Sequence, residues 1–148
     1  PKGKGWAPIY YSIFNNETFF TISGITASNK VDSGKIIVKG KFKILPNHTA
    51  EYIRKWDEEI SIILIKTILK KIKNTKISGI PQKGKITFYK KRLPEDNELS
   101  SKNMINHLRA CEKNHPAFFY NKNEKFFINI EPENIPKFPK DLKIKFYF

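Results

Sequence analysis

The sequence predicts an α+β fold, in which a mostly antiparallel twisted sheet is covered by one long buried helix and accompanied by one short helix. Apolar and polar residues alternate over 35–45 and 142–148, as in half-buried strands. Residues 50–73 instead have the spacing and charge distribution of a helix. With 148 residues, 39% hydrophobic and 14% aromatic, the chain can form one core, so residues 1–148 are expected to be a single domain.

Strands are expected to come first. Residues 6–14 and 17–24 are rich in aromatic and β-branched side chains, and Asn15-Asn16 between them suits a tight turn, so this region predicts a hairpin. Residues 35–45 predict a strand with one buried face and one lysine-bearing face. The buried face has Val38, Phe42 and Ile44, and the opposite face has Lys39, Lys41 and Lys43.

The predicted long helix begins after Thr49, a residue that favours the N-cap position. Its acidic residues lie in its first half and its lysines in its last turns, which suits the helix dipole. The second half is apolar on nearly all sides, so the helix is expected to be buried on most of its surface. The short apolar run 60–65 is also compatible with a strand.

Two further strands are predicted at 76–80 and 85–93, joined by a turn at 81–84. An acidic loop follows at 94–99. A short helix is then expected from a Ser100 or Ser101 cap to Cys111, with Met104, Ile105 and Leu108 facing inward.

The C-terminal part predicts a second hairpin, a crossing segment and a last strand. The hairpin strands are 117–121 and 125–131, and their aromatic pairs are expected to lie in the core. Prolines at 132, 136 and 139 favour an extended crossing. The strand 142–148 alternates apolar residues with Lys143, Lys145 and Tyr147.

The positive charge is concentrated in the middle of the chain. Lys and Arg total 28 against 14 acidic residues, and residues 30–92 hold 17 of the basic and 5 of the acidic residues. This segment therefore carries +12 of the net +14. Such an excess of positive charge is typical of proteins that bind polyanions. The predominance of Lys over Arg favours contacts with the phosphate backbone of a nucleic acid over recognition of its bases. A bias toward Lys, Ile and Asn from an AT-rich genome explains the predominance of Lys over Arg equally well.

The lysine-bearing strand faces carry the functional interpretation. If three strands share one sheet, one face presents lysines for phosphates and tyrosines for stacking on unpaired bases. The candidate residues are Lys39, Lys41, Lys43, Lys85, Tyr89, Lys91, Lys143, Lys145 and Tyr147. The sequence thus favours non-catalytic binding of nucleic acid, with RNA or single strands preferred. An ordinary solvated sheet face accounts for the same pattern.

Two other functions remain open. His48, His107 and His115 would suit a metal-independent ribonuclease or a toxin-like ribonuclease domain, in which one histidine abstracts a proton and another donates one. A protein-interaction domain with an acidic partner would use the same basic surface, within a larger complex or a longer parent chain.

Several chemistries are not expected. Cys111 is the only cysteine, and no sequence motif for a nucleotide, metal or acyl-enzyme site is present, so neither a metal nor a cofactor is predicted. The longest apolar run is shorter than a membrane span. A soluble protein is therefore expected; its compartment is not fixed, with an intracellular one favoured. No known family is recognised in these residues.

Overall fold

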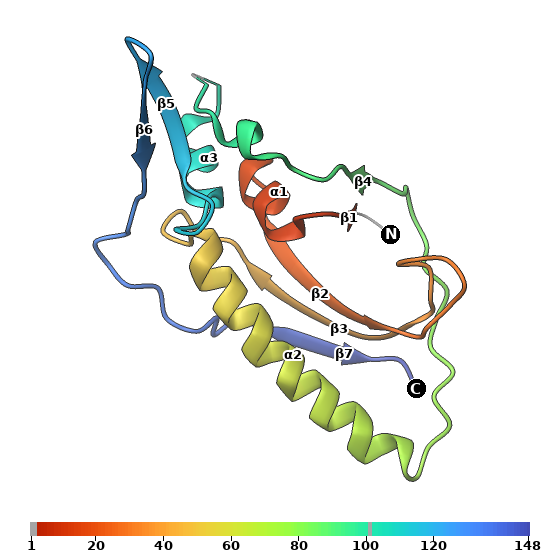
Figure 1. Ribbon diagram of the computed structural model, residues 1–148. Coiled ribbons are helices and arrows are strands. Elements are labelled where there is room, and N and C mark those ends of the chain that lie inside the picture. Colours follow the sequence, from red (N-terminus) through yellow and green to blue (C-terminus); the bar gives the residue numbers. More distant parts are fainter. Residues whose placement is uncertain (1–2, 101) are drawn as a thin grey trace.

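The computed structural model describes residues 3–100 and 102–148, and within them the chain forms a mixed α/β structure (Figure 1). The elements in chain order are β1 (Lys4–Gly5), α1 (Pro8–Phe14), β2 (Phe19–Ile25), β3 (Ile36–Lys43), α2 (Ala50–Ile72), β4 (Phe88–Tyr89), the 3-10 helix η1 (Pro94–Asn97), α3 (Met104–Ala110), β5 (Ala117–Asn121), β6 (Glu124–Ile128) and β7 (Lys143–Phe146). The strands do not form the one predicted sheet. They form separate small sheets with the orders β2–β3–β7, β1–β4 and β5–β6.

The β2–β3–β7 sheet is antiparallel, and α2 packs on one of its faces. Period-two alternation places Phe20, Val38 and Phe42 on that face, where they join Ile53 and Ile60 of α2 in the core. The predictions of a half-buried strand over 35–45 and of a last strand near the C-terminus are confirmed. Side chains at the intervening positions project from the opposite face of the sheet.

The predicted N-terminal hairpin is wrong, because residues 8–14 form α1 rather than a strand. Pro8 occupies the first turn of this helix, where its missing N–H costs nothing. Ile9, Tyr10 and Ile13 are buried, which is a helical spacing. The second half of the prediction, a strand over 17–24, matches β2.

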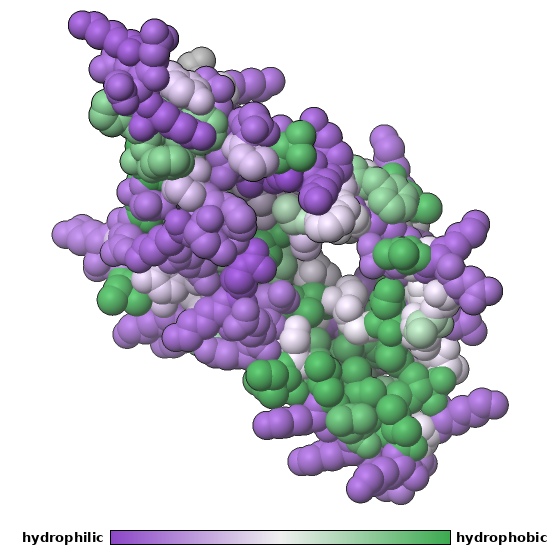
Figure 2. Space-filling view, in the orientation of Figure 1, coloured by the Kyte–Doolittle hydropathy of each residue, from purple (hydrophilic) through white to green (hydrophobic). Residues whose placement is uncertain are grey.

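The long helix is confirmed, but its burial is not. Only one face of α2 is buried, and Ile62, Ile65 and Leu69 are more than half exposed. In Figure 2 apolar side chains gather at the surface over the second half of α2. The Thr49 side chain makes no capping hydrogen bond, although its backbone has the extended N-cap conformation. None of the described helices is both long and apolar enough to cross a membrane.

The region between α2 and α3 contains less strand than expected. Of residues 76–93, only Phe88–Tyr89 form a strand, with Ile80 making an isolated bridge to Ile36. The predicted acidic loop contains η1.

The short helix α3 begins at Met104 after Asn103, so Ser100 does not cap it; Ser101 lies outside the described residues. Met104 and Ile105 are exposed rather than inward, and the helix instead buries His107, Arg109 and Ala110. The hydrophobic face was therefore assigned to the wrong side of this helix.

The second hairpin is confirmed as β5 and β6, joined by Lys122 and Asn123, both with positive φ as a tight hairpin turn requires. Its aromatic residues are only partly in the core. Phe118 is buried, whereas Tyr120 and Phe127 are more than half exposed.

Candidate functional site

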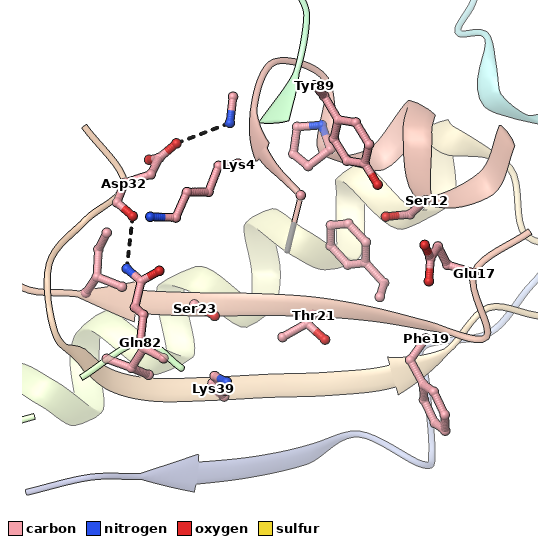
Figure 3. Close-up of a pocket in the computed structure, with 16 residues that line it drawn as sticks. Lys4, Ser12, Glu17, Phe19, Thr21, Ser23, Asp32, Lys39, Gln82 and Tyr89 are labelled. Atoms are coloured by element: carbon pink, nitrogen blue, oxygen red, sulfur yellow. Dashed lines mark hydrogen bonds between the residues drawn. The ribbon is translucent and has the colours of Figure 1, made fainter. Parts of the chain in front are cut away.

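A cavity of about 450 Å³ lies over the face of the β2–β3 pair opposite α2 (Figure 3). Thr21, Ser23 and Lys39 project into it from the sheet, because they alternate with the residues that face α2. The rest of the wall comes from α1, from the segment 3–5, from the β2–β3 loop and from residues 82–89. Segments far apart in the sequence therefore build the cavity together.

The segment 3–5 closes one side of the cavity by pairing with β4. The Gly3 N–H donates to the Thr87 hydroxyl at 2.8 Å, and the Lys4 N–H donates to the Thr87 carbonyl at 3.0 Å. Gly5 has φ +95, and a Cβ there would lie 2.5 Å from the Tyr89 carbonyl oxygen. Only glycine allows this close approach. The Tyr89 ring lines the cavity and stacks on Tyr11, with centroids 4.2 Å apart.

The β2–β3 loop holds Asp32 at the cavity edge. The loop is closed at its base, where the Thr26 N–H donates to the Lys35 carbonyl and the Lys35 N–H donates to the Thr26 hydroxyl, both at 2.9 Å. A Cβ on Gly34 would lie 1.7 Å from the Thr26 carbonyl oxygen, so the loop can close only with glycine at this position. Asp32 itself has φ +54, a conformation that asparagine and aspartate adopt more readily than most residues.

Two other segments fix Asp32 in this loop. Its Oδ2 accepts a hydrogen bond from the Gly5 N–H at 3.3 Å, and its backbone carbonyl accepts one from the Gln82 side-chain amide at 2.9 Å. The same amide nitrogen also donates to the Gly34 carbonyl at 2.8 Å. Figure 3 shows these hydrogen bonds on Asp32, with the Lys4 side chain on the same side of the cavity. The Oδ1 atom of Asp32 has no recorded partner among the described residues, so it remains available to a ligand.

The cavity combines groups suited to acyl transfer. Asp32 and Glu17 provide carboxylates, and Lys4 and Lys39 provide cations. A carboxylate can accept a proton from a nucleophile, and a fixed cation can stabilise negative charge on a carbonyl oxygen. In the part of the chain that the structure describes, no cluster of metal-ligating side chains is found.

The predicted binding residues are brought together only in part. Lys39, Lys41, Lys43, Lys143 and Lys145 lie on one face of the β2–β3–β7 sheet, as predicted. Lys85 and Lys91 do not belong to this sheet, because the only strand in their segment, β4, pairs with β1. Tyr89 lines the cavity from that segment. Tyr147 follows β7, and its ring lies 5.4 Å from the Lys145 ammonium.

The histidines do not form a catalytic pair. His48 and His107 are buried, His115 lies in an exposed loop, and none of the three lines the cavity. Burial, assisted by the nearby Arg109 guanidinium, lowers the pKa of His48 to about 4. Burial and the charge of Arg92 likewise lower the pKa of His107. Both imidazoles are therefore neutral at pH 7.

Comparison with known proteins finds relatives among the formyltransferases. Over 119 residues the chain is 37% identical to the methionyl-tRNA formyltransferase of Borrelia garinii subsp. bavariensis, an alignment that covers 75% of this chain and 36% of that protein. The chain thus spans little more than a third of the length of this relative. No family model matches it.

Solved structures share the fold. A methionyl-tRNA formyltransferase from Clostridium thermocellum superposes with a TM-score of 0.71 at 21% identity, over 99% of this chain and 65% of that one. An N-formyltransferase from Helicobacter canadensis, in complex with folinic acid and dTDP-3-aminofucose, superposes with a TM-score of 0.68 at 22% identity, over 83% and 48%.

The chain is therefore similar to formyltransferases in sequence, and it shares their fold. In sequence, the similarity is to the methionyl-tRNA formyltransferases in particular. The interpretation as a non-catalytic nucleic-acid-binding domain is therefore wrong. It was drawn from net charge and lysine alternation, which describe a surface and carry no information about a reaction.

Sequence reasoning missed Asp32, Gln82 and the glycines around them. The sequence segment Val31-Asp32-Ser33-Gly34 offered one signal, an aspartate beside a glycine in the loop between two strands. Gly3 and Gly5 offered another. Neither pattern shows that the two segments meet.

Proposed function

We propose that this chain is part of an N-formyltransferase that acts on methionyl-tRNA, and that its cavity surrounds the reacting groups. The proposal is supported above all by the 37% identity to a methionyl-tRNA formyltransferase over 119 residues. The cavity gives it a chemical basis, because Asp32 is held there by three segments with one carboxylate oxygen available.

Formyl transfer to an amine needs few groups. The amine nitrogen attacks the formyl carbon, a new C–N bond forms, and the bond from that carbon to the donor nitrogen breaks. The amine loses one proton and the donor nitrogen gains one. We assign the acceptance of the amine proton to Asp32, and the stabilisation of negative charge on the carbonyl oxygen to Lys4.

The donor class suggested by the Helicobacter canadensis protein is a folate. The residues present fit such a group, since 450 Å³ is within the range of small-molecule sites and the Tyr89 ring offers a flat surface in the cavity wall. A bound formyl-folate would supply the formyl group. The chain's own residues would hold it and orient the amine toward the formyl carbon.

A chimera tests the proposal. This chain would replace the corresponding segment of the Borrelia garinii relative, and transfer of labelled formyl from a formyl-tetrahydrofolate to methionyl-tRNA would be measured. We expect activity, and we expect Asp32→Asn to lower kcat by at least about 100-fold, because it removes the proton acceptor. The control Glu58→Gln, an exposed position on α2, removes one negative charge outside the cavity and should leave kcat unchanged.

Two results would contradict the proposal. An inactive chimera that folds and binds methionyl-tRNA would show that this segment does not support the reaction. Full activity of Asp32→Asn would remove Asp32 from the chemistry. A parallel assay with a nucleotide-linked amino sugar as acceptor would show whether a sugar, rather than methionyl-tRNA, is the substrate.

A further inference from the structure

Four lysines form a two-by-two array on the cavity face of the β2–β3–β7 sheet. In the antiparallel register, Lys39 lies directly opposite Lys145, and Lys41 lies directly opposite Lys143. Directly opposed side chains have Cβ atoms about 5 Å apart, and residues two apart along a strand are about 7 Å apart. These four residues are called the lysine quartet below.

The chain does not neutralise the lysine quartet. Within residues 3–100 and 102–148, none of the four forms a salt bridge. The Lys41 ammonium lies 3.7 Å from the centroid of the Phe19 ring, which offers it a weak attraction only. Asp141, at the end of the row, accepts the backbone N–H of Lys43 at 2.9 Å. Like charges directly opposite each other destabilise an antiparallel pair, so the array stores repulsion that a bound anion would relieve.

The lysine quartet is continuous with the cavity. Lys39 lines the cavity, and so do Ser23 and Thr21, which lie opposite Lys39 and Lys41 on β2. Phe19, under the Lys41 ammonium, also belongs to the cavity wall. An anionic group held by the quartet can therefore be part of the same molecule whose reactive end lies beside Asp32.

We propose that the lysine quartet binds phosphate groups of a ligand whose reactive end occupies the cavity. The lysine ammonium binds phosphate as a compact point charge. It does not need the bidentate geometry with which arginine binds carboxylate or phosphate. Four lysine side chains that leave the sheet from a rectangle of Cβ atoms of about 5 by 7 Å can place their ammonium groups around a diphosphate, or around successive backbone phosphates of RNA, and offer more positive charge than one carboxylate requires. The identification of this ligand as the acceptor substrate rests on the proposed function; the phosphate site itself does not.

Binding of two probes to this chain tests the proposal. Inorganic pyrophosphate and a tRNA would be titrated separately by calorimetry at low salt. For Lys39→Gln/Lys145→Gln, we expect pyrophosphate binding to weaken by about tenfold or more, because two charged contacts are lost. If the phosphates come from RNA, the same variant should also reduce the salt dependence of tRNA affinity by about two in log–log slope.

The matched control is Lys66→Gln/Lys70→Gln. It removes the same charge from exposed positions on α2, which packs on the other face of the sheet. We expect it to change pyrophosphate affinity by less than about twofold. Equal losses from the two double variants would show that only net charge matters and would overturn the site. So would binding of a triglutamate peptide in preference to pyrophosphate, or no binding of either phosphate probe.

A second measurement needs no ligand. Lys145→Gln removes a like-charge pair, so we expect Tm in phosphate-free buffer to rise by about 1–3 °C. Lys137→Gln, at an exposed position outside the helices and strands, should leave Tm unchanged. A fall in Tm for Lys145→Gln would contradict the stored repulsion. Asp32→Asn separates the two proposals, because it should leave pyrophosphate affinity intact. Full formyl transfer by this variant would overturn the role of Asp32 and would leave the phosphate site unaffected.

Discussion

The burial of a neutral imidazole makes the stability of this fold depend on pH in a defined window. His48 is 4% exposed, and its Nδ1 accepts a hydrogen bond from the Leu45 N–H at 3.2 Å. Protonation of Nδ1 would break this bond and create a buried cation beside Arg109, whose guanidinium donates to the His48 carbonyl at 3.0 and 3.1 Å. We therefore expect acid to destabilise the native state through this residue.

The magnitude follows from the pKa. Burial and Arg109 lower the pKa of His48 from 6.5 to about 4 in the folded chain. The unfolded state therefore binds the proton more readily, and the stability present at pH 7 is lost as the pH falls through 6.5 toward 4. The full shift corresponds to about 3 kcal/mol, of which about 2 kcal/mol is lost by pH 5.

Urea denaturation at pH 7.5 and pH 5 measures this loss. His48→Gln cannot titrate in this window, so it should be less stable than the native chain at pH 7.5 but should lose about 2 kcal/mol less on acidification. His107, whose pKa is also lowered by burial, contributes equally in both proteins. Equal losses of unfolding free energy in the two proteins would refute the reasoning.

Three further substitutions test the packing described above, each by urea denaturation at pH 7. Gly34→Ala should cost at least about 2 kcal/mol because its Cβ would lie 1.7 Å from a backbone oxygen, whereas Gly40→Ala, with 3.4 Å to its nearest neighbour, should cost about 1 kcal/mol or less. Arg109→Met should cost about 1–3 kcal/mol, because the His48 carbonyl loses its guanidinium donor, whereas the Leu45 carbonyl keeps the His48 N–H. Ile60→Ala, at a fully buried position, should cost about 2–5 kcal/mol, and Ile65→Ala, 55% exposed, about 0.5 kcal/mol.

The strands and the long helix could be predicted where one local pattern dominates. Over 36–43, period-two alternation and a lysine face agree, and β3 follows. Residues 8–14 contain a conflict instead: their aromatic and β-branched side chains favour strand, but Pro8 and the spacing of Ile9 and Ile13 suit a helix. The helical spacing prevails because α1 packs against α2 and α3.

Burial is less predictable than secondary structure, because it depends on what packs against an element. The apolar second half of α2 suggested burial on most sides. In the described chain the β2–β3–β7 sheet and α1 cover only one face of α2, so Ile62 and Leu69 stay exposed. In α3 the aliphatic residues suggested the inward face. The buried face holds Arg109 instead, because its guanidinium satisfies the carbonyls of Leu45 and His48 at the start of α2.

The candidate site could not be predicted from the sequence, because the residues that form it are far apart in the chain. Asp32 is positioned by Gly5, 27 residues earlier, and by Gln82, 50 residues later. No periodicity connects such segments, so a pattern-based analysis sees only an aspartate in a loop. The lysines of β3 and β7 could be predicted, because within each strand they occupy every second position.

In β3, residues that pack in the core alternate with residues that face the cavity side of the sheet. Val38 and Phe42 face α2 and are fully buried, so their truncation would open a cavity and cost stability. Lys39 and Lys41 lie between them in sequence but face the other side, where they contact the cavity wall or solvent. Substitutions one residue apart should therefore have unlike consequences: loss of folding at 38 and 42, and loss of anion binding with folding intact at 39 and 41.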